Sequence, residues 1–125
     1  MRLRVLPGAY AVCRLDPAQH LPPAPAAAAF WSLTKAGDEW SLVCADGDAP
    51  QDTDAIVSPG WRILAVEGPL DLGLTGVLAS LAGTLATADV PIFPLATHDT
   101  DWILVPGDRL DVAVAALRGD GHVVD

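Results

Sequence analysis

Apolar residues are most regularly spaced in the second half of the chain. Between residues 74 and 88 they recur every three or four positions, the spacing of an amphipathic helix with one buried face. This helix is expected to end at Asp89, because Pro91 cannot continue it. The positions of the expected buried face are Leu74, Val77, Leu78, Leu81, Ala82 and Leu85.

Short apolar runs before and after this helix predict strands. Pro94 lies inside one of them and lacks a backbone N–H group, which places that strand at an edge or a bulge. A second helix is expected after Asp108, a residue type suited to capping a first helical turn. The resulting βαββαβ order is typical of a two-layer α+β sandwich with an antiparallel sheet. The expected strands are residues 61–66, 92–96, 102–105 and 122–124, and the second helix is residues 109–118.

The first half of the chain repeats this order weakly. Residues 16–25 contain four prolines and stand where a first helix would be expected, so they predict a loop. We expect residues 1–55 to be a degenerate copy with its helices reduced to loops, and residues 56–125 to be the complete domain. The expected strands of the first half are residues 3–6, 10–15, 30–34 and 40–44, the last two forming a hairpin.

The overall composition indicates a folded protein and narrows its partners. Hydrophobic residues make up 51% of the 125 residues, enough for one compact domain or two very small ones. The net charge of −9 repels phosphate backbones and anionic lipid surfaces, so neither nucleic acid nor membrane is expected as a partner. No apolar run has the length of a membrane span and no secretory signal is recognisable, so a cytoplasmic location is expected.

The side chains that would carry catalysis or hold a metal lack the necessary spacing. Cys13 and Cys44 are expected to be buried small hydrophobic residues, with a disulfide or a reactive thiol as the alternatives. His20 and His122 are far apart in sequence, so no metal site is expected. No serine or cysteine pairs with a histidine at a motif spacing, and no phosphate-binding glycine motif occurs. We therefore expect no catalytic activity and no cofactor.

The segment DLGLTGVL at residues 71–78 resembles the turn of the ACT domain, in which an acidic residue precedes a glycine, an aliphatic residue and a leucine. GPLDLGLTGVLASLAGTLATADVPIF, followed by ATHDTDWILV, is similar to short bacterial tandem ACT proteins, which are related to the ACT pairs of eukaryotic arginine sensors. The resemblance covers residues 10–124 and implies a ferredoxin-like fold, tandem ACT domains with a degenerate first half, and amino-acid binding. The chain departs from the pattern at Thr75, where proline is common, and at His98, where relatives usually have an aromatic residue.

The expected binding site lies at the start of the first helix, which is expected near Gly76. The first N–H groups of a helix have no internal partner, and the helix dipole adds partial positive charge there. The N–H groups of residues 73–77 can therefore hold the carboxylate of an amino acid, and Asp71 or Asp101 its ammonium group. The resemblance implies that Thr97 and His98 close on the ligand and that Asp101 faces a cationic group. The candidate ligand-binding residues are Asp71, Leu72, Gly73, Thr75, Gly76, Val77, Thr97, His98 and Asp101.

These residues also have structural interpretations. Gly76 can ease packing of the helix on a strand, Asp71 and Thr75 can cap the helix, and Asp101 can stabilise a turn. Two functions therefore remain open, an amino-acid sensor and an interaction or dimerisation module whose pocket has decayed. For the sensor we expect a homodimer with the ligand at the junction between ACT units, a cationic ligand such as arginine or lysine, and an unidentified downstream protein.

Overall fold

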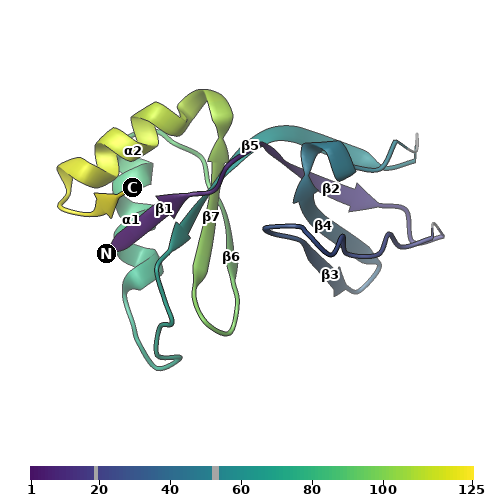
Figure 1. The fold of residues 1–125 in the computed structure, drawn as a ribbon, viewed down its shortest axis with the longest axis horizontal. Helices are drawn as coiled ribbons and strands as arrows, with labels where there is room; N and C mark the ends of the chain where they lie inside the picture. The colour runs from purple at the N-terminus through teal and green to yellow at the C-terminus, as the bar shows by residue number, and fades with distance from the viewer. Residues whose placement is uncertain (19, 52–53) are drawn as a thin grey trace. The chain divides into compact units, whose positions relative to one another are not determined.

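The computed structural model describes residues 1–18, 20–51 and 54–125, which form two compact units. Met1–Pro7 and Arg62–Asp125 form one unit, here called the helical unit (Figure 1). Gly8–Trp61 forms the other, here called the strand unit. Among the described residues, no helix is both long enough and apolar enough to cross a membrane.

From β5 to β8 the helical unit has the predicted βαββαβ order, to which β1 adds a further strand, and it is a ferredoxin-like α+β domain. Its sheet has the strand order β6-β7-β5-β1-β8. In the described part of the chain β6 pairs with β7 alone, which confirms the edge position inferred from Pro94. The elements are β1 (Arg2–Val5), β5 (Ile56–Val66), α1 (Val77–Thr87), β6 (Phe93–Ala96), β7 (Asp101–Pro106), the 3₁₀ turn η2 (Gly107–Arg109), α2 (Leu110–Gly119) and β8 (Val123–Val124).

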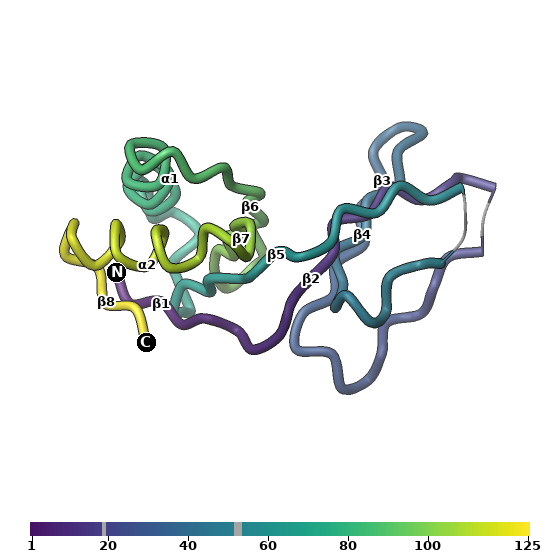
Figure 2. The backbone as a smooth tube through the Cα atoms, turned by 90° about the horizontal axis from the view of Figure 1, so that it is seen from above, coloured from purple at the N-terminus to yellow at the C-terminus, as the bar shows by residue number. Residues whose placement is uncertain are grey.

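Strand β1 differs from the prediction in its partners. It lies between β5 and β8, antiparallel to β5 and parallel to β8, so the sheet is not antiparallel throughout. The two chain ends consequently lie close together (Figure 2). A division at residue 55 separates β1 from this sheet, whereas the structure groups Met1–Pro7 with the helical unit. The physical reason is Leu3, which is fully buried in the core of that unit.

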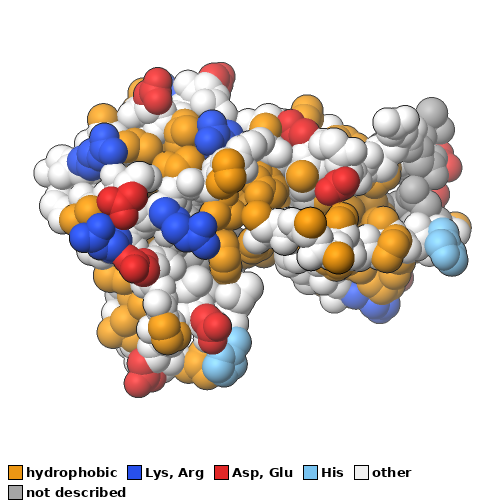
Figure 3. All heavy atoms as spheres, viewed as in Figure 1, with side chains coloured by type: hydrophobic (Ala, Val, Ile, Leu, Met, Phe, Trp, Pro, Cys, Tyr) orange, Lys and Arg blue, Asp and Glu red, His pale blue; other side chains and the backbone are white. Residues whose placement is uncertain are grey.

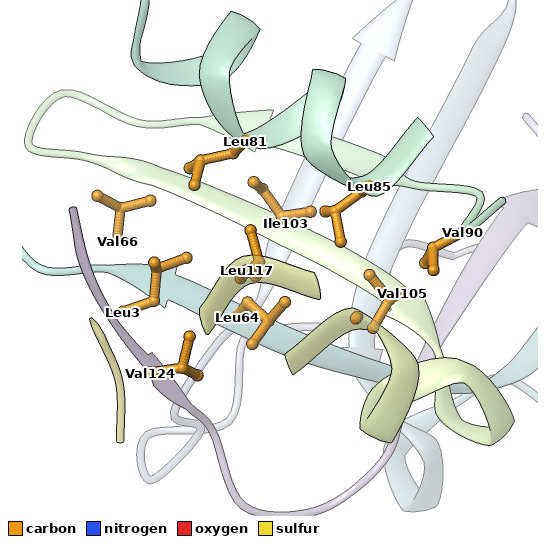
Figure 4. Packing of buried hydrophobic residues seen from close by; sticks show 11 residues of the cluster. Leu3, Leu64, Val66, Leu81, Leu85, Val90, Ile103, Val105, Leu117 and Val124 are labelled. Atoms are coloured by element: carbon orange, nitrogen blue, oxygen red, sulfur yellow. The ribbon is translucent and has the colours of Figure 1, made fainter. Parts of the chain in front are cut away.

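The core of the helical unit lies between its two helices and the sheet. Leu81 and Leu85 of α1 point towards Ile103 of β7 in Figure 4, and Leu117 packs into the same cluster from α2. Burial of these side chains holds the helices on the sheet, at about 1.5 to 3 kcal/mol for each fully buried large aliphatic side chain. The buried members of the cluster are Leu3, Leu64, Val66, Leu81, Leu85, Val90, Ile103, Val105, Ala113, Leu117 and Val124.

The expected helix start near Gly76 is confirmed, although the apolar spacing extended the helix back to Leu74. The helix begins at Val77, and Gly76 before it has the left-handed backbone conformation, with φ +84°. The chain therefore turns at Gly76, which leaves Leu74 outside the helix. Leu74 and Leu78 are exposed, so their prediction as core residues was wrong. The helical spacing of apolar residues includes Leu74, although the chain turns at Gly76 before the helix begins. In the sequence, the glycine is the only sign of this turn.

The start of α2 also differs from the prediction. The expected N-cap Asp108 lies inside the 3₁₀ turn η2, and no side-chain hydrogen bond caps α2. The tighter turn takes up Gly107–Arg109, so the α-helix begins only at Leu110. The predicted inward face is otherwise confirmed, since Leu117 is buried and Leu110 and Val114 pack against the core.

The strand unit contains an antiparallel sheet of order β3-β4-β2-β5. The helical unit has the same arrangement if β1 is left out, since its order is then β6-β7-β5-β8. In both sheets the second strand in the chain is at one edge, followed by the third, the first and the fourth. Residues 8–18, 20–51 and 54–61 contain no α-helix; apolar side chains from the loops, including Leu21 and Ala49, cover one sheet face instead. Residue 19 of the predicted loop lies outside the described residues. The additional elements are β2 (Tyr10–Leu15), β3 (Ser32–Ala36), β4 (Glu39–Ala45) and the 3₁₀ turn η1 (Asp46–Asp48).

Strand β5 begins at Ile56 rather than at the predicted residue 61. Ser58 pairs with Val12 and Trp61 with Tyr10, so β5 has one more residue than β2 between these pairs. The intervening Pro59 and Gly60 form a bulge, and Gly60 has φ +82°. In a sequence, proline followed by glycine usually indicates a turn, so the strand was predicted to begin only after Gly60. Bulges within strands also accommodate both residue types, and the longer strand was therefore missed.

The two cysteines lie on neighbouring strands and are both free thiols. Cys13 and Cys44 are fully buried among apolar side chains, which agrees with their interpretation as small hydrophobic residues. Burial raises the pKa of both thiols, and burial together with the neighbouring Cys13 raises the pKa of Cys44 to about 12. Both thiols are therefore protonated at neutral pH, which is their unreactive form.

Candidate functional site

A cavity of about 270 Å³ lies in the helical unit between two loops. One is the segment of residues 67–76 that joins β5 to α1, here called the glycine loop. The other is the turn of residues 97–100 that joins β6 to β7, here called the threonine turn. The cavity is lined by Leu70, Asp71, Leu72, Leu74, Gly76, Val77, Leu78, Ala79, Ala96, Thr97, His98, Asp99, Thr100 and Asp101.

The structure brings most of the predicted site residues to this cavity. Gly73 and Thr75 are the exceptions, since neither lines it. The seven predicted residues that do line the cavity are Asp71, Leu72, Gly76, Val77, Thr97, His98 and Asp101. Sequence reasoning missed the remaining lining residues, among them Leu70 and Thr100.

The N-terminus of α1 forms one wall of the cavity. No side chain caps this helix, and its first N–H groups, in residues 77–79, have no carbonyl one turn before them within the helix. The helix dipole places partial positive charge at the same point. A Cβ on Gly76 would meet nothing within 4 Å, so close packing does not explain this glycine. Its φ of +84° does, because that conformation directs the chain into the helix.

Asp71 organises the glycine loop rather than capping α1. Its Oδ1 accepts a hydrogen bond from the backbone N–H of Gly73 at 2.8 Å, and its carbonyl oxygen accepts one from the N–H of Leu74 at 3.0 Å. This is the local side-chain turn typical of aspartate. The N–H of Gly73 is therefore already engaged within the loop, and the expected helix cap by Asp71 was wrong.

The threonine turn forms the opposite wall. The backbone N–H and the hydroxyl of Thr97 both donate to the carbonyl oxygen of Thr100, at 2.9 and 3.1 Å. The indole N–H of Trp102 donates to the Thr97 hydroxyl at 2.9 Å. At the tip, His98 Nδ1 lies 2.9 Å from Asp99 Oδ1, and both side chains are largely exposed.

The two walls touch near the start of the glycine loop. The backbone N–H of Leu70 donates to the carbonyl oxygen of Asp99 at 2.6 Å. Gly68 lies so close that a Cβ on it would be 2.9 Å from the same oxygen. These contacts are made by backbone atoms, which every residue has, so no residue type in the sequence indicates them. The only available signal was Gly68, two residues after the end of a predicted strand.

The charges around the cavity are unequal. Asp71, Asp99 and Asp101 line it together with His98, and its described lining includes neither lysine nor arginine. The cavity therefore presents carboxylates on its side chains and partial positive charge at the helix end. Such a combination suits a ligand that carries a carboxylate and at least one cationic group.

Exposed leucines surround the mouth of the cavity. Leu72 is 74% exposed and Leu74 is 53% exposed, and Leu78 is also exposed. Figure 3 shows hydrophobic, acidic and histidine side chains together at the end of the helical unit that carries the two loops. The described residues, including those of the cavity, contain no group of three histidine, cysteine or acidic side chains able to hold a metal ion.

The strand order defines a ferredoxin-like domain. In this domain an open cavity of a size suited to a small ligand lies between a helix N-terminus and a hairpin turn. Residues 56–119 match the model of the ACT domain family, and the chain belongs to this family. A second family model, described as an N-terminal domain, matches residues 8–52.

The chain is also similar to a curated protein and to a solved structure. The cytosolic arginine sensor for mTORC1 subunit 1 of Bos taurus is 36% identical over 64 residues, which are 49% of this chain and 20% of the sensor. The match thus spans about a fifth of that curated relative. A crystal structure of a protein from Agrobacterium tumefaciens is 32% identical, with a TM-score of 0.87 over 99% of this chain and 91% of that one.

The fold also occurs in enzyme regulation. The ligand-free regulatory subunit of aspartate kinase from Thermus thermophilus has a TM-score of 0.63, over 94% of this chain and 95% of that one. Its sequence identity is 11%, so the likeness concerns the fold alone.

Proposed function

We propose that this protein is a non-catalytic amino-acid sensor whose ligand binds in the cavity between the glycine loop and the threonine turn. The observation that carries the proposal is the pairing of an uncapped helix N-terminus with three carboxylates around one cavity. Membership of the ACT family and likeness to an arginine sensor support amino-acid binding as the class of function.

The two ends of the cavity suit the two charges of an amino acid. The ligand carboxylate accepts hydrogen bonds from the first N–H groups of α1, where the helix dipole is favourable. The ammonium group lies against Asp101 or Asp71. Gly73 and Thr75 contribute through the shape of the loop, and Gly76 through the turn into the helix.

A cationic side chain on the ligand fits the remaining charge. After one carboxylate neutralises the ammonium group, the lining still has two others, and it lacks lysine and arginine in its described part. A second cationic group on the ligand would neutralise one of them. The proposed ligands are therefore arginine and lysine.

The proposed sensor is a cytoplasmic homodimer that passes its signal to another protein. The exposed leucines at the cavity mouth support an association of this kind, because apolar side chains in a cluster are typical of contact surfaces. Nucleic acid and membranes are not among the proposed partners, given the net charge of −9. Light scattering tests the assembly: the mass of a dimer is expected, and the mass of a monomer at micromolar concentration would contradict it.

The alternative is an interaction module that binds no ligand. Its support is the same set of exposed leucines, together with the engagement of the Gly73 N–H inside its own loop. Both features are compatible with a contact surface that has replaced a binding site.

Thermal unfolding in the presence of each of the twenty amino acids distinguishes the two functions. At one hundred times its Kd a ligand stabilises the native state by about 2.7 kcal/mol, which raises the melting temperature by several degrees. We expect arginine or lysine to produce this shift and Asp101→Asn to abolish most of it. Asp38→Asn removes the same charge from the strand unit and is expected to leave the shift unchanged. Flat curves with all twenty amino acids would favour the interaction module.

A further inference from the structure

Thr100 is a lining residue whose side chain is hydrogen-bonded to the sheet of the helical unit. It is half-buried, and its hydroxyl donates to the carbonyl oxygen of Val66, the last residue of β5, at 2.6 Å. Its own carbonyl oxygen accepts both hydrogen bonds from Thr97. Thr100 therefore joins the end of β5 to both ends of the threonine turn.

The position of Thr100 also constrains the path of the glycine loop. The neighbouring carbonyl of Asp99 accepts the hydrogen bond from Leu70, and Gly68 would bring a Cβ to 3.1 Å from the Thr100 Cβ. The glycine loop thus starts at the strand end that Thr100 holds and then crosses directly over the threonine turn. Moving the Thr100 side chain away from Val66 would move the two walls relative to each other.

We propose that Thr100 is the positioning residue of this pocket, and that its hydrogen bond to Val66 sets the separation between the helix N-terminus and the carboxylates of Asp99 and Asp101. Groups that bind one ligand together must be held within about 0.5 Å of their working positions by the residues behind them. The effect on ligand affinity rests on the proposed function, whereas the effect on the loops does not.

Hydrogen exchange of the ligand-free protein tests the loop part of the proposal. Thr100→Val keeps the side-chain shape but leaves the Val66 carbonyl without its donor. The amide protons of Leu70 and Thr97 are expected to exchange up to about tenfold faster in this variant. Thr100→Ser retains the hydroxyl and is expected to return both rates close to those of the natural protein.

Thr84→Val is the matched control, because the Thr84 hydroxyl donates to Asp120 away from the cavity. It is expected to leave the exchange of Leu70 and Thr97 unchanged. Equal exchange in Thr100→Val and the natural protein would overturn the proposal, and so would equal acceleration in Thr84→Val or no recovery in Thr100→Ser.

Calorimetric titration with L-arginine tests the affinity part. We expect Thr100→Val to bind about tenfold more weakly, Thr100→Ser to recover most of the affinity, and Thr84→Val to be unaffected. Unchanged affinity in Thr100→Val would contradict the role in positioning. If the natural protein binds no L-arginine, arginine is excluded as the ligand, and the exchange rates alone decide whether Thr100 holds the walls.

Discussion

Leu85→Ala is expected to lower the free energy of unfolding of the helical unit by about 3 to 5 kcal/mol. Leu85 is fully buried and points from α1 into the core shown in Figure 4. Truncation removes apolar contacts and leaves a cavity that the helix and the sheet can close only by moving towards each other. Because small domains are stable by only about 5 to 15 kcal/mol, this one change would remove a large part of the total.

Urea unfolding followed by circular dichroism measures this loss. Leu72→Ala is the matched control, since Leu72 belongs to the same unit but is 74% exposed. Its expected effect lies within about 0.5 kcal/mol of zero. Similar losses in the two variants would mean that α1 does not pack on the sheet through Leu85.

Gly68→Ala is expected to destabilise the helical unit by about 1 to 3 kcal/mol and to weaken amino-acid binding. A Cβ there would lie 2.9 Å from the Asp99 carbonyl oxygen and 3.1 Å from the Thr100 Cβ. The first of these atoms belongs to the backbone, so the glycine loop must move away from the threonine turn. The hydrogen bond from Leu70 to Asp99 lies at the same contact and would be strained with it.

Gly83→Ala provides the comparison for this second prediction. Gly83 lies inside α1, and a Cβ on it would meet nothing within 4 Å. Alanine there is expected to stabilise the protein by about 1 kcal/mol, because it favours the helix. Melting temperatures of the two variants should therefore change in opposite directions. A stable Gly68→Ala protein with normal ligand binding would show that the two loops need not touch.

The spacing of apolar residues predicted well those elements whose pattern lies within a few neighbouring residues. The strand at residues 10–15 has the bounds of β2, and the hairpin of β3 and β4 lies within two residues of its predicted position. The partners of β1 could not be predicted, because four extended residues do not specify which distant strand they pair with. The start of α1 was predicted near Gly76, although the leucine spacing continued through this left-handed glycine as far back as Leu74.

In the candidate site too, residues were predicted where their role depends on neighbouring residues and missed where it depends on a distant contact. Residues beside the helix N-terminus were found because a helix start identifies its own unpaired N–H groups. The threonine turn was included through the resemblance to the ACT family. Gly68, Leu70 and Thr100 were missed because their roles depend on a contact between two loops about 30 residues apart in the chain, and on backbone atoms that every residue has.

The central claim is that the cavity at the start of α1 binds an amino acid. Backbone amide resonances of the ¹⁵N-labelled protein, recorded while each amino acid is added, test it most directly. We expect saturable shifts for arginine or lysine, concentrated in residues 76–79 and 97–101 on the two walls. Shifts confined to the strand unit, or none with any of the twenty amino acids, would contradict the claim.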